Sequence, residues 1–336
     1  MPRVTVLTAV YNGERFLEEA IESVLAQTFG DFEFLVVDDG SQDATPELLA
    51  RYAARDERIR VLRNKPNQGQ TPSLNRGLES AEAPYIARLD ADDLCLPERL
   101  EAQTRFLDDH PAVGLLGSCT EVMDEEGNVL DRLTAPRGDA MHRARLLFNN
   151  TFMHSAVMFR KELAFEAGLY DAELEKADLF QDYDLWCRMA PLTRMDSHPA
   201  TLVRWRRGQG LSLTHKEAQL QGAREISLRA VQRQMGEKKL DADAFRRFWW
   251  AYHREAPERL EPGDIAKLQA LWEVLGAVPA AAQAFGAGMG RLGLQLLTVG
   301  QTAEGQALLR QTARRFGIHV PWRERMKARI RAALRR

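Results

Sequence analysis

Three aspartates crowd the end of one apolar run. The stretch YIARLDADDLCLPERL, residues 85–100, places Asp90, Asp92 and Asp93 directly after Tyr85–Leu89. Repulsion among neighbouring carboxylates raises at least one pKa unless a cation lies between them. In an extended segment Asp90 and Asp92 would point the same way, and their oxygens could share a Mg²⁺ or Mn²⁺ ion. The alternative is an acidic entry to the following helix, which needs no ligand.

Two other acidic pairs stand at the borders of predicted elements. Asp38 and Asp39 end the run FEFLVVDD, where carboxylates suit hydrogen bonds to a ribose or a base, or alternatively an Asx turn. Asp182 and Asp184 open the amphipathic stretch QDYDLWCRM. A carboxylate there could act as a general base toward a hydroxyl, or it could simply cap a helix.

The elements that must position these acids alternate between strand and helix over residues 4–110. We predict strands at VTVLTAV, FEFLVVDDGS, IRVLR and YIARLDADD, with helices at ERFLEEAIESVLAQTF, TPELLARYAAR and TPSLNRGLESA. Such alternation predicts an α/β fold with a mostly parallel central sheet flanked by helices. Ligands bind at the carboxyl ends of such strands. The residues that follow the first, second and fourth predicted strands should therefore share one crevice.

The rest of the chain changes character twice. Over residues 111–212 we expect a mixed extension of the sheet, with strands at VGLLGSCTEVMD and HSAVMF, a turn at EEGN and helices near 139–148 and at QDYDLWCRMA. From residue 213 the sequence is helical and rich in Arg and Ala, and GRLGLQLLTVGQTAEGQALLRQTARRFG predicts two helices joined near Gly300. We therefore predict one domain at 1–212 and a helical C-terminal extension at 213–336.

Bulk composition excludes several classes of protein. A formal net charge of −2 over 336 residues gives no general reason to expect nucleic-acid binding. Three widely spaced cysteines without a CxxC pair favour a reducing cytoplasm over a disulfide framework or a zinc site. No uncharged apolar stretch is long enough to span a bilayer.

The last seventeen residues, VPWRERMKARIRAALRR, hold seven Lys or Arg and one Glu. Trp322, Met326, Ile330 and Ala333 recur at helical spacing, so this helix could lie on an anionic membrane at its inner face. A solvated terminal helix and a contact between subunits are the alternatives. A homo-oligomer is left open.

Taken together, these strings resemble the inverting glycosyltransferases of family 2, of the non-processive bacterial type, which have the GT-A fold of nucleotide-diphospho-sugar transferases. The resemblance runs from about residue 3 to 212 and rests on VTVLTAVYNGERFLEEAIESVLAQTFGDFEFLVVDDGSQDAT, NQGQTPSLNRGL, YIARLDADD, HSAVMFRKELAFEAGLYD and QDYDLWCRM, in the family's order. It implies a metal-dependent hexosyl- or N-acetylhexosaminyltransferase that uses Mg²⁺ or Mn²⁺. UDP is the leading nucleotide, with GDP and dTDP as alternatives, and the acceptor would be a glycan or lipid-linked glycan in surface polysaccharide synthesis.

The resemblance also implies roles for matching residues. Asp90-Ala91-Asp92 would be the DxD motif, with Asp90 and Asp92 at the metal, and Asp182 would be the catalytic base. The positions implied for the nucleotide sugar are Thr8, Tyr11, Glu14, Asp38, Asp39, Asn67, Gly69, Asn75, Arg88, His154 and Arg206. Without the resemblance His154 reads as a structural histidine.

The chain departs from the family pattern at a few places. Gln181 stands where a glutamate often precedes the base. Arg206 or Arg207 stands where the family often has a histidine, so the last metal ligand and the contacts to the donor phosphates are open. The QxxRW string of processive synthases is absent, which favours transfer of a single sugar. The rival hypotheses are a nucleotidyltransferase, although TAVYNGERF lacks its Gly- and Lys/Arg-rich loop, and a catalytically inactive sugar-nucleotide-binding scaffold.

Overall fold

The computed structural model describes residues 1–175, 180–207, 216–253, 259–276, 279–316 and 319–334. The chain forms two compact units. The first comprises residues 1–139 and 150–219, and the second comprises residues 140–149 and 220–336. The predicted boundary at 212 lies outside the described residues, and the two-domain limits stay a prediction.

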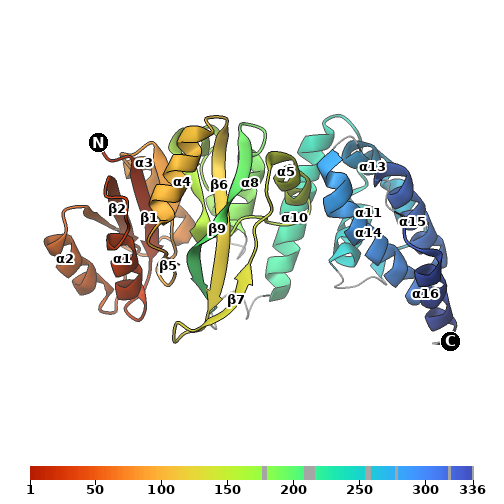
Figure 1. The fold of residues 1–336 in the computed structure, drawn as a ribbon, viewed down its shortest axis with the longest axis horizontal. Coiled ribbons are helices and arrows are strands. Elements are labelled where there is room, and N and C mark those ends of the chain that lie inside the picture. Colours follow the sequence, from red (N-terminus) through yellow and green to blue (C-terminus); the bar gives the residue numbers. More distant parts are fainter. Residues whose placement is uncertain (176–179, 208–215, 254–258, 277–278, 317–318, 335–336) are drawn as a thin grey trace. The chain divides into compact units, whose positions relative to one another are not determined.

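The first unit begins with the alternating pattern that the sequence predicts (Figure 1). Its elements are β1 (Val4–Val10), α1 (Leu17–Leu25), β2 (Phe32–Asp38), α2 (Thr45–Arg55), β3 (Ile59–Arg63), α3 (Gln70–Ser80) and β4 (Tyr85–Arg88). The strands pair in parallel in the order β3-β2-β1-β4. Every residue of β1 and β2 is buried, as expected for parallel strands that are covered on both faces. The parallel part of the predicted sheet is therefore confirmed.

The remaining strands extend this sheet in mixed directions. They are β5 (Leu94–Cys95), β6 (Val113–Met123), β7 (Val129–Leu133), β8 (Met158–Arg160) and β9 (Arg194–Arg206), and the order continues β4-β8-β6-β9-β5, with β7 paired to β6. The β8 strand runs antiparallel to both β4 and β6, while β6 and β9 are parallel. The helices between them are α4 (Arg99–Asp109), α6 (Lys161–Glu166), α7 (Ala172–Glu175) and α8 (Gln181–Met189).

Three sequence predictions need correction here. The fourth strand ends at Arg88, and Ala91 and Asp92 lie in a turn, so the segment from Asp90 to Asp92 is not extended. The predicted strand HSAVMF starts with a 3-10 turn, His154–Ala156, before β8. The long strand β9 and the short strands β5 and β7 were not predicted.

The second unit is helical. Its helices are α5 (Asp139–Leu146), α10 (Lys216–Met235), α11 (Ala242–Tyr252), α12 (Asp264–Lys267), α13 (Gln269–Gly276), α14 (Pro279–Thr298), α15 (Thr302–Phe316) and α16 (Trp322–Leu334), although α5 and α10 begin within the first unit's ranges. The predicted helix pair joined near Gly300 corresponds to α14 and α15, and Gly300 has a φ of 89° at the junction. Among the described residues, no helix is long and apolar enough to cross a membrane.

Phe148 anchors the aromatic core of this unit. Its ring lies within 5.3 to 6.1 Å of the rings of Phe245, Phe248 and Tyr252, and its carbonyl accepts a hydrogen bond from Trp249 Nε1 at 3.1 Å. The side chains of Phe148, Phe245, Phe248 and Trp249 are almost fully buried. The short segment 140–149 is therefore an integral part of the helical unit's core.

Candidate active site at the carboxyl ends of the strands

The acidic loop after β4 lies beside the loop that follows β1. Leu89 N–H donates to Leu7 O at 3.1 Å, and Thr8 Oγ1 donates to Leu89 O at 2.8 Å. A Cβ atom added to Gly13 would lie 3.9 Å from the Cβ of Ala91, so the two loops touch. As the sequence predicts, the carboxyl ends of neighbouring strands bring these loops to one edge of the sheet. The hydroxyl of Thr8, predicted to frame the nucleoside, holds this edge together.

Asp90 is held by three side chains. Arg88 Nη2 lies 2.5 Å from Asp90 Oδ1, Ser155 Oγ donates to Oδ2 at 2.8 Å, and Gln70 Nε2 lies 3.4 Å from Oδ1. Burial acts to raise the pKa of Asp90, but the charge of Arg88 and the hydrogen bonds from Ser155 and Arg88 outweigh it and hold that pKa below its ordinary value. Asp90 is therefore an ionised carboxylate with a fixed orientation.

Arg88 is fully buried, yet its partners are incomplete. Among the described residues, Arg88 Nε and Nη1 have no hydrogen-bond partner. A buried guanidinium with unused donors is costly unless a ligand or water completes it. The unused donors of Arg88 suit its predicted place at the nucleotide-sugar cleft, which stays a prediction.

Asp92 differs from Asp90 in the direction in which its pKa is shifted. Burial raises the pKa of Asp92 to about 6, and the charge of Asp90 adds to the increase. Two carboxylates that repel each other in this way fit a divalent cation, which would keep both ionised. In the described part of the chain, no group of three or more His, Cys, Asp or Glu could hold a metal ion. Such a cation would therefore depend on oxygens from substrate and water for its other positions.

Arg206 braces the acidic loop from within the protein. Its backbone N–H donates to Asp93 Oδ1 at 2.8 Å, and its Nε donates to Asp92 O at 2.9 Å. Its remaining guanidinium nitrogens bind Glu125 O at 2.7 Å and Glu19 Oε2 at 2.7 Å. Because all three side-chain nitrogens already bind protein oxygens, this arrangement does not favour the predicted direct contact of Arg206 with the donor. Burial holds the pKa of Asp93 well above its ordinary value, and Asp90 and Asp92 add to the effect.

Asp182 stands at the first turn of α8. Its Oδ2 accepts a hydrogen bond from Asn150 Nδ2 at 2.8 Å, and its Oδ1 accepts from Tyr183 N–H at 2.7 Å. Burial raises the pKa of Asp182 to about 6 despite these two bonds, and the charge of Asp90 contributes to the rise. A carboxylate with a pKa near the working pH can both accept and release a proton, as a general base must.

A chain of amides links Asp182's helix to the acidic loop. Gln181 Nε2 donates to Gln70 Oε1 at 2.8 Å, and Gln70 Nε2 in turn approaches Asp90. Gln70 and Gln181 are the first residues of α3 and α8. The departure from the family pattern at Gln181 is therefore accommodated by a neutral partner, and α8 stays attached to the site.

The second strand's acids organise the neighbouring loop. Asp39 is almost fully buried and accepts hydrogen bonds from Asn64 Nδ2 at 2.7 Å, Gln68 N–H at 2.9 Å and Gly69 N–H at 2.8 Å. Asp38 accepts from Ser41 N–H at 2.9 Å, and its second oxygen lies 3.2 Å from Arg63 Nε. Since an ionised carboxylate has about four acceptor sites, Asp39 can still accept one more hydrogen bond.

Other predicted nucleotide-sugar residues divide into exposed and structural ones. Tyr11 is 47% exposed, and Asn67 and Glu14 are also exposed, so all three are accessible at this edge. Glu14 Oε2 accepts from the N–H of Ala44, just before α2, at 2.9 Å. Gly69, with a φ of 98°, precedes α3 in a conformation that L side chains rarely adopt.

Asn75 and His154 serve the framework in this structure. The side-chain amide of Asn75 pairs with both the N–H and the carbonyl of Tyr170, at 3.0 and 2.8 Å. His154 Nε2 lies 3.0 Å from Tyr170 Oη, and burial together with the charge of Arg88 lowers the pKa of His154 well below its ordinary value. A neutral histidine in this place agrees with the structural reading, and its role toward the donor stays a prediction.

Three residues of the site escaped the sequence analysis. Ser155, Gln70 and Asn150 hold Asp90 or Asp182, and each lies far from its partner along the chain. Only their positions could have pointed to them: Ser155 follows His154, Gln70 lies within NQGQTPSLN, and Asn150 comes two residues after the helix predicted near 139–148. Because these side chains are uncharged, they form no charge cluster that would identify them as site residues in the sequence.

Comparison with known proteins places this chain in a family. The model of "Glycosyl transferase family 2" matches residues 5–166. The amylovoran biosynthesis glycosyltransferase AmsE of Erwinia amylovora is 34% identical over 211 residues, which cover 62% of this chain and 77% of AmsE. The chain belongs to glycosyltransferase family 2.

Other family 2 relatives match over a similar region. The putative glycosyltransferase EpsE of Bacillus subtilis is 35% identical over 190 residues, covering 56% of this chain and 66% of EpsE, slightly less than two thirds of its length. Among solved structures, S. aureus TarS 1-349 in complex with UDP-GlcNAc has a TM-score of 0.59 at 17% identity, covering 95% of this chain and 93% of TarS 1-349. The mannosyltransferase PcManGT from Pyrobaculum calidifontis in complex with GDP-Man and Mn²⁺ has a TM-score of 0.55 at 19% identity. This match covers 94% of this chain and 87% of PcManGT. These two likenesses establish the shared GT-A-type fold.

Proposed function

We propose that this chain is an inverting glycosyltransferase that moves one hexosyl or N-acetylhexosaminyl unit from a nucleotide-diphosphate sugar, preferably a UDP-sugar, to a hydroxyl of an acceptor. The observation that carries the proposal is Asp182, a carboxylate with a pKa of about 6 that is linked through Gln181 and Gln70 to Asp90. The acid that would take the acceptor's proton and the acids that would face the donor diphosphate thus share one site.

The mechanism follows from the charges. Ionised Asp182 accepts the proton of the acceptor hydroxyl as that oxygen attacks the anomeric carbon, and the nucleoside diphosphate leaves from the opposite face. The bond to the acceptor forms as the bond to the diphosphate breaks, so the configuration inverts. Arg88 supplies positive charge toward the leaving group. A Mg²⁺ or Mn²⁺ ion held by Asp90 and Asp92 would add Lewis-acid stabilisation of the diphosphate.

The acceptor class is inferred from relatives. AmsE is named for amylovoran biosynthesis, and another relative is the O-antigen biosynthesis glycosyltransferase WbnJ of Escherichia coli, 27% identical over 207 residues. These names support a glycan or lipid-linked glycan acceptor in surface polysaccharide synthesis. The UDP-GlcNAc and GDP-Man in the titles of the two solved structures support a nucleotide-sugar donor.

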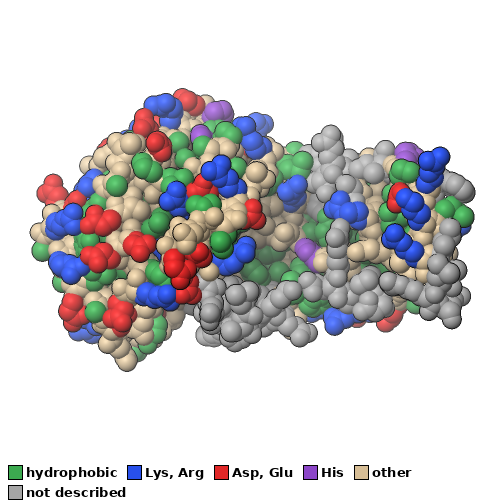
Figure 2. Space-filling model, turned by 60° about the horizontal axis from the view of Figure 1, so that its bottom comes forward, with side chains coloured by type: hydrophobic (Ala, Val, Ile, Leu, Met, Phe, Trp, Pro, Cys, Tyr) green, Lys and Arg blue, Asp and Glu red, His purple; other side chains and the backbone are tan. Residues whose placement is uncertain are grey.

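The proposed location is the cytoplasm, with α16 at the inner face of the membrane. None of the three cysteines, Cys95, Cys119 and Cys187, forms a disulfide, which supports a reducing compartment. The distribution of charged side chains also supports a protein that does not bind nucleic acid. On the face shown in Figure 2, acidic and basic side chains are interspersed over the described surface of the first unit.

Calorimetry of nucleotide binding is the direct test. We expect one of UDP, GDP, dTDP and CMP to bind in a Mn²⁺-dependent way, and Asp92→Asn to weaken that binding at least ten-fold, because the variant removes one cation ligand and one charge. Asp109→Asn, an exposed aspartate at the end of α4, is the matched control and should bind like the wild type. Equal binding by Asp92→Asn and the wild type would refute the metal assignment, and no nucleotide binding at all would favour the inactive scaffold.

A further inference from the structure

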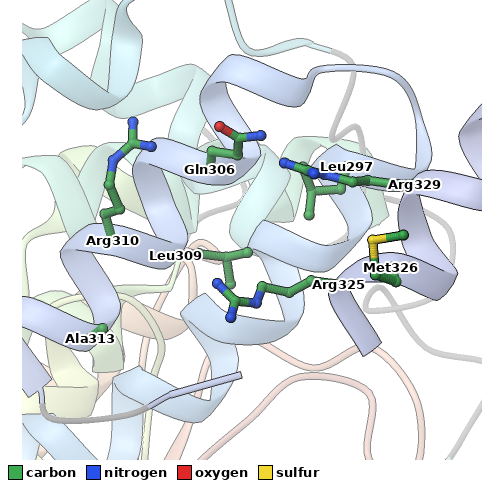
Figure 3. Close-up of a pocket in the computed structure, with 8 residues that line it drawn as sticks. All are labelled: Leu297, Gln306, Leu309, Arg310, Ala313, Arg325, Met326 and Arg329. Carbon is green, nitrogen blue, oxygen red and sulfur yellow. The ribbon is translucent and has the colours of Figure 1, made fainter. Parts of the chain in front are cut away.

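A cavity in the helical unit lies among α14, α15 and α16. It has a volume of about 390 Å³, and its lining includes Leu297, Leu309, Arg310, Arg325, Met326 and Arg329. Figure 3 shows Arg325 and Arg329 extending from α16 toward α15, with Arg310 on α15 at the other side. Three guanidinium groups and an apolar floor thus share one cavity.

The charge in this cavity is not neutralised within the described part of the chain. None of the three arginine side chains there forms a hydrogen bond or an ion pair with another described residue, and no carboxylate lines the cavity. The acid of α16, Glu324, lines a neighbouring cavity and is bound to Lys327 at 2.8 Å. All three arginines are exposed, as is Arg51 of the first unit, which nevertheless binds the carboxylate of Glu18. The cavity is therefore a locally cationic site.

The floor of the cavity is apolar and closely packed. Leu297 and Leu309 are almost fully buried and pack with Ala328 of α16. Beneath them α14 and α15 approach closely, because a Cβ on Gly305 would lie 2.8 Å from the carbonyl oxygen of Gly293. Such a distance is too short for any side chain, so this crossing requires a glycine at position 305.

We propose that this cavity binds the phosphate head group of an anionic phospholipid. Guanidinium groups bind phosphate oxygens in pairs, and Arg325 and Arg329 stand one helical turn apart, where both can reach one phosphate. The cavity volume is roughly thirteen times the ~30 Å³ that one water molecule occupies in the liquid, so inorganic phosphate would leave most of the cavity empty. Leu309 and Met326 offer apolar contact for the part of the lipid next to the phosphate.

This inference sharpens the proposed membrane contact of α16 without depending on sugar transfer. A basic amphipathic helix attracts anionic lipid through all its positive charges, whereas a binding site depends on the few charged side chains that line it. The readout is lipid binding, so the inference can fail while the proposed reaction stands, and the reverse also holds.

The test compares two double variants of the full chain that lose the same charge. Arg325→Gln/Arg329→Gln removes two arginines of the cavity, and Arg323→Gln/Arg331→Gln removes two exposed arginines of the same helix that do not line it. Co-sedimentation uses vesicles of phosphatidylcholine alone or with 30% phosphatidylglycerol. We expect the cavity variant to bind the anionic vesicles at least ten-fold more weakly than the control variant, with equal melting temperatures.

Soluble probes separate a lipid from a free phosphate compound. Dihexanoyl-phosphatidylglycerol should bind the wild type and the control variant in calorimetry, and Arg325→Gln/Arg329→Gln should lose that binding. Inorganic pyrophosphate should bind at least ten-fold more weakly than this lipid. Equal loss in both double variants would mean attraction by the whole helix and would overturn the site. Pyrophosphate binding without lipid binding would overturn the lipid assignment.

Discussion

Asp182 carries the clearest prediction at the scale of a single residue. Asp182→Asn should lower kcat by about 10²- to 10⁴-fold, because general-base catalysis typically contributes that much. Donor affinity should change less than two-fold, since Asp182 binds Asn150 and a backbone N–H and not the acidic loop. Steady-state turnover of the donor identified by calorimetry, together with donor binding, checks both parts. Near-normal kcat would exclude Asp182 as the base.

The same substitution should stabilise the fold, which guards against mistaking unfolding for lost catalysis. A carboxyl whose pKa rises from 3.8 to about 6 on folding stabilises the folded state below pH 4, and that contribution disappears as pH rises through 6. At pH 7.5 the ionised side chain therefore lowers the free energy of unfolding by at most ~3 kcal/mol, since one pKa unit corresponds to about 1.36 kcal/mol. The amide of Asp182→Asn has only one oxygen for the two donors, Asn150 and the Tyr183 N–H, so one hydrogen bond is lost. We therefore expect urea denaturation to show a free energy of unfolding only about 1 kcal/mol higher than that of the wild type.

The pH profile of turnover should report the same group. Because Asp182 must be ionised to accept a proton, kcat should fall about ten-fold per unit of pH below its pKa of about 6 and level off above it. Donor binding measured at each pH separates this loss from protonation of Asp92, whose pKa is also about 6. A kcat that stays flat from pH 7.5 to 5 would contradict the assignment.

At the scale of elements, two helix starts are joined by a pair of amides. Gln181→Ala removes the bond from α8 to Gln70 on α3 and should lower kcat about ten-fold while changing donor affinity less than two-fold, because it loosens the position of Asp182. Gln232→Ala, an exposed glutamine of α10, is the control. A loss in donor affinity equal to the loss in kcat would instead place Gln181 in donor binding.

The elements also show what a sequence reveals. Helix α2 spans Thr45–Arg55, the stretch that its periodicity predicts, because a Pro at its first turn and regular apolar spacing are local signals. Strand β9 was missed because Pro199 interrupts its pattern and its partner β6 is distant in sequence. Charged clusters such as Asp90 and Asp92 were visible, whereas Gln70 and Ser155 acquire their roles only through contacts that the fold creates.

At the scale of the whole molecule, the chain contributes to its second unit twice. Residues 140–149 belong to the helical unit, where Leu146 and Phe148 are buried, although first-unit residues follow them in the sequence. A chain ended after residue 219 would keep these side chains and lose the aromatic partners of Phe148. We expect such a chain to aggregate in size-exclusion chromatography, because the apolar surface stays exposed.

A rescue variant makes that expectation specific. Leu146→Ser with Phe148→Ser in the shortened chain should restore a monomeric peak, since it removes the exposed apolar groups and leaves the sheet unchanged. If the shortened chain with its native residues is already monomeric, the core contacts of Phe148 do not limit its solubility.

The bracing of the acidic loop by Arg206 bears on the kinetics of donor capture. The backbone of Asp92 and the side chain of Asp93 are already fastened to β9, so little conformational entropy remains to be lost when a ligand arrives. Association at Asp90 and Asp92 should therefore proceed as a single fast phase, limited by encounter. Arg206 would in this way influence the speed of capture through the loop that it holds, without needing a contact of its own with the donor.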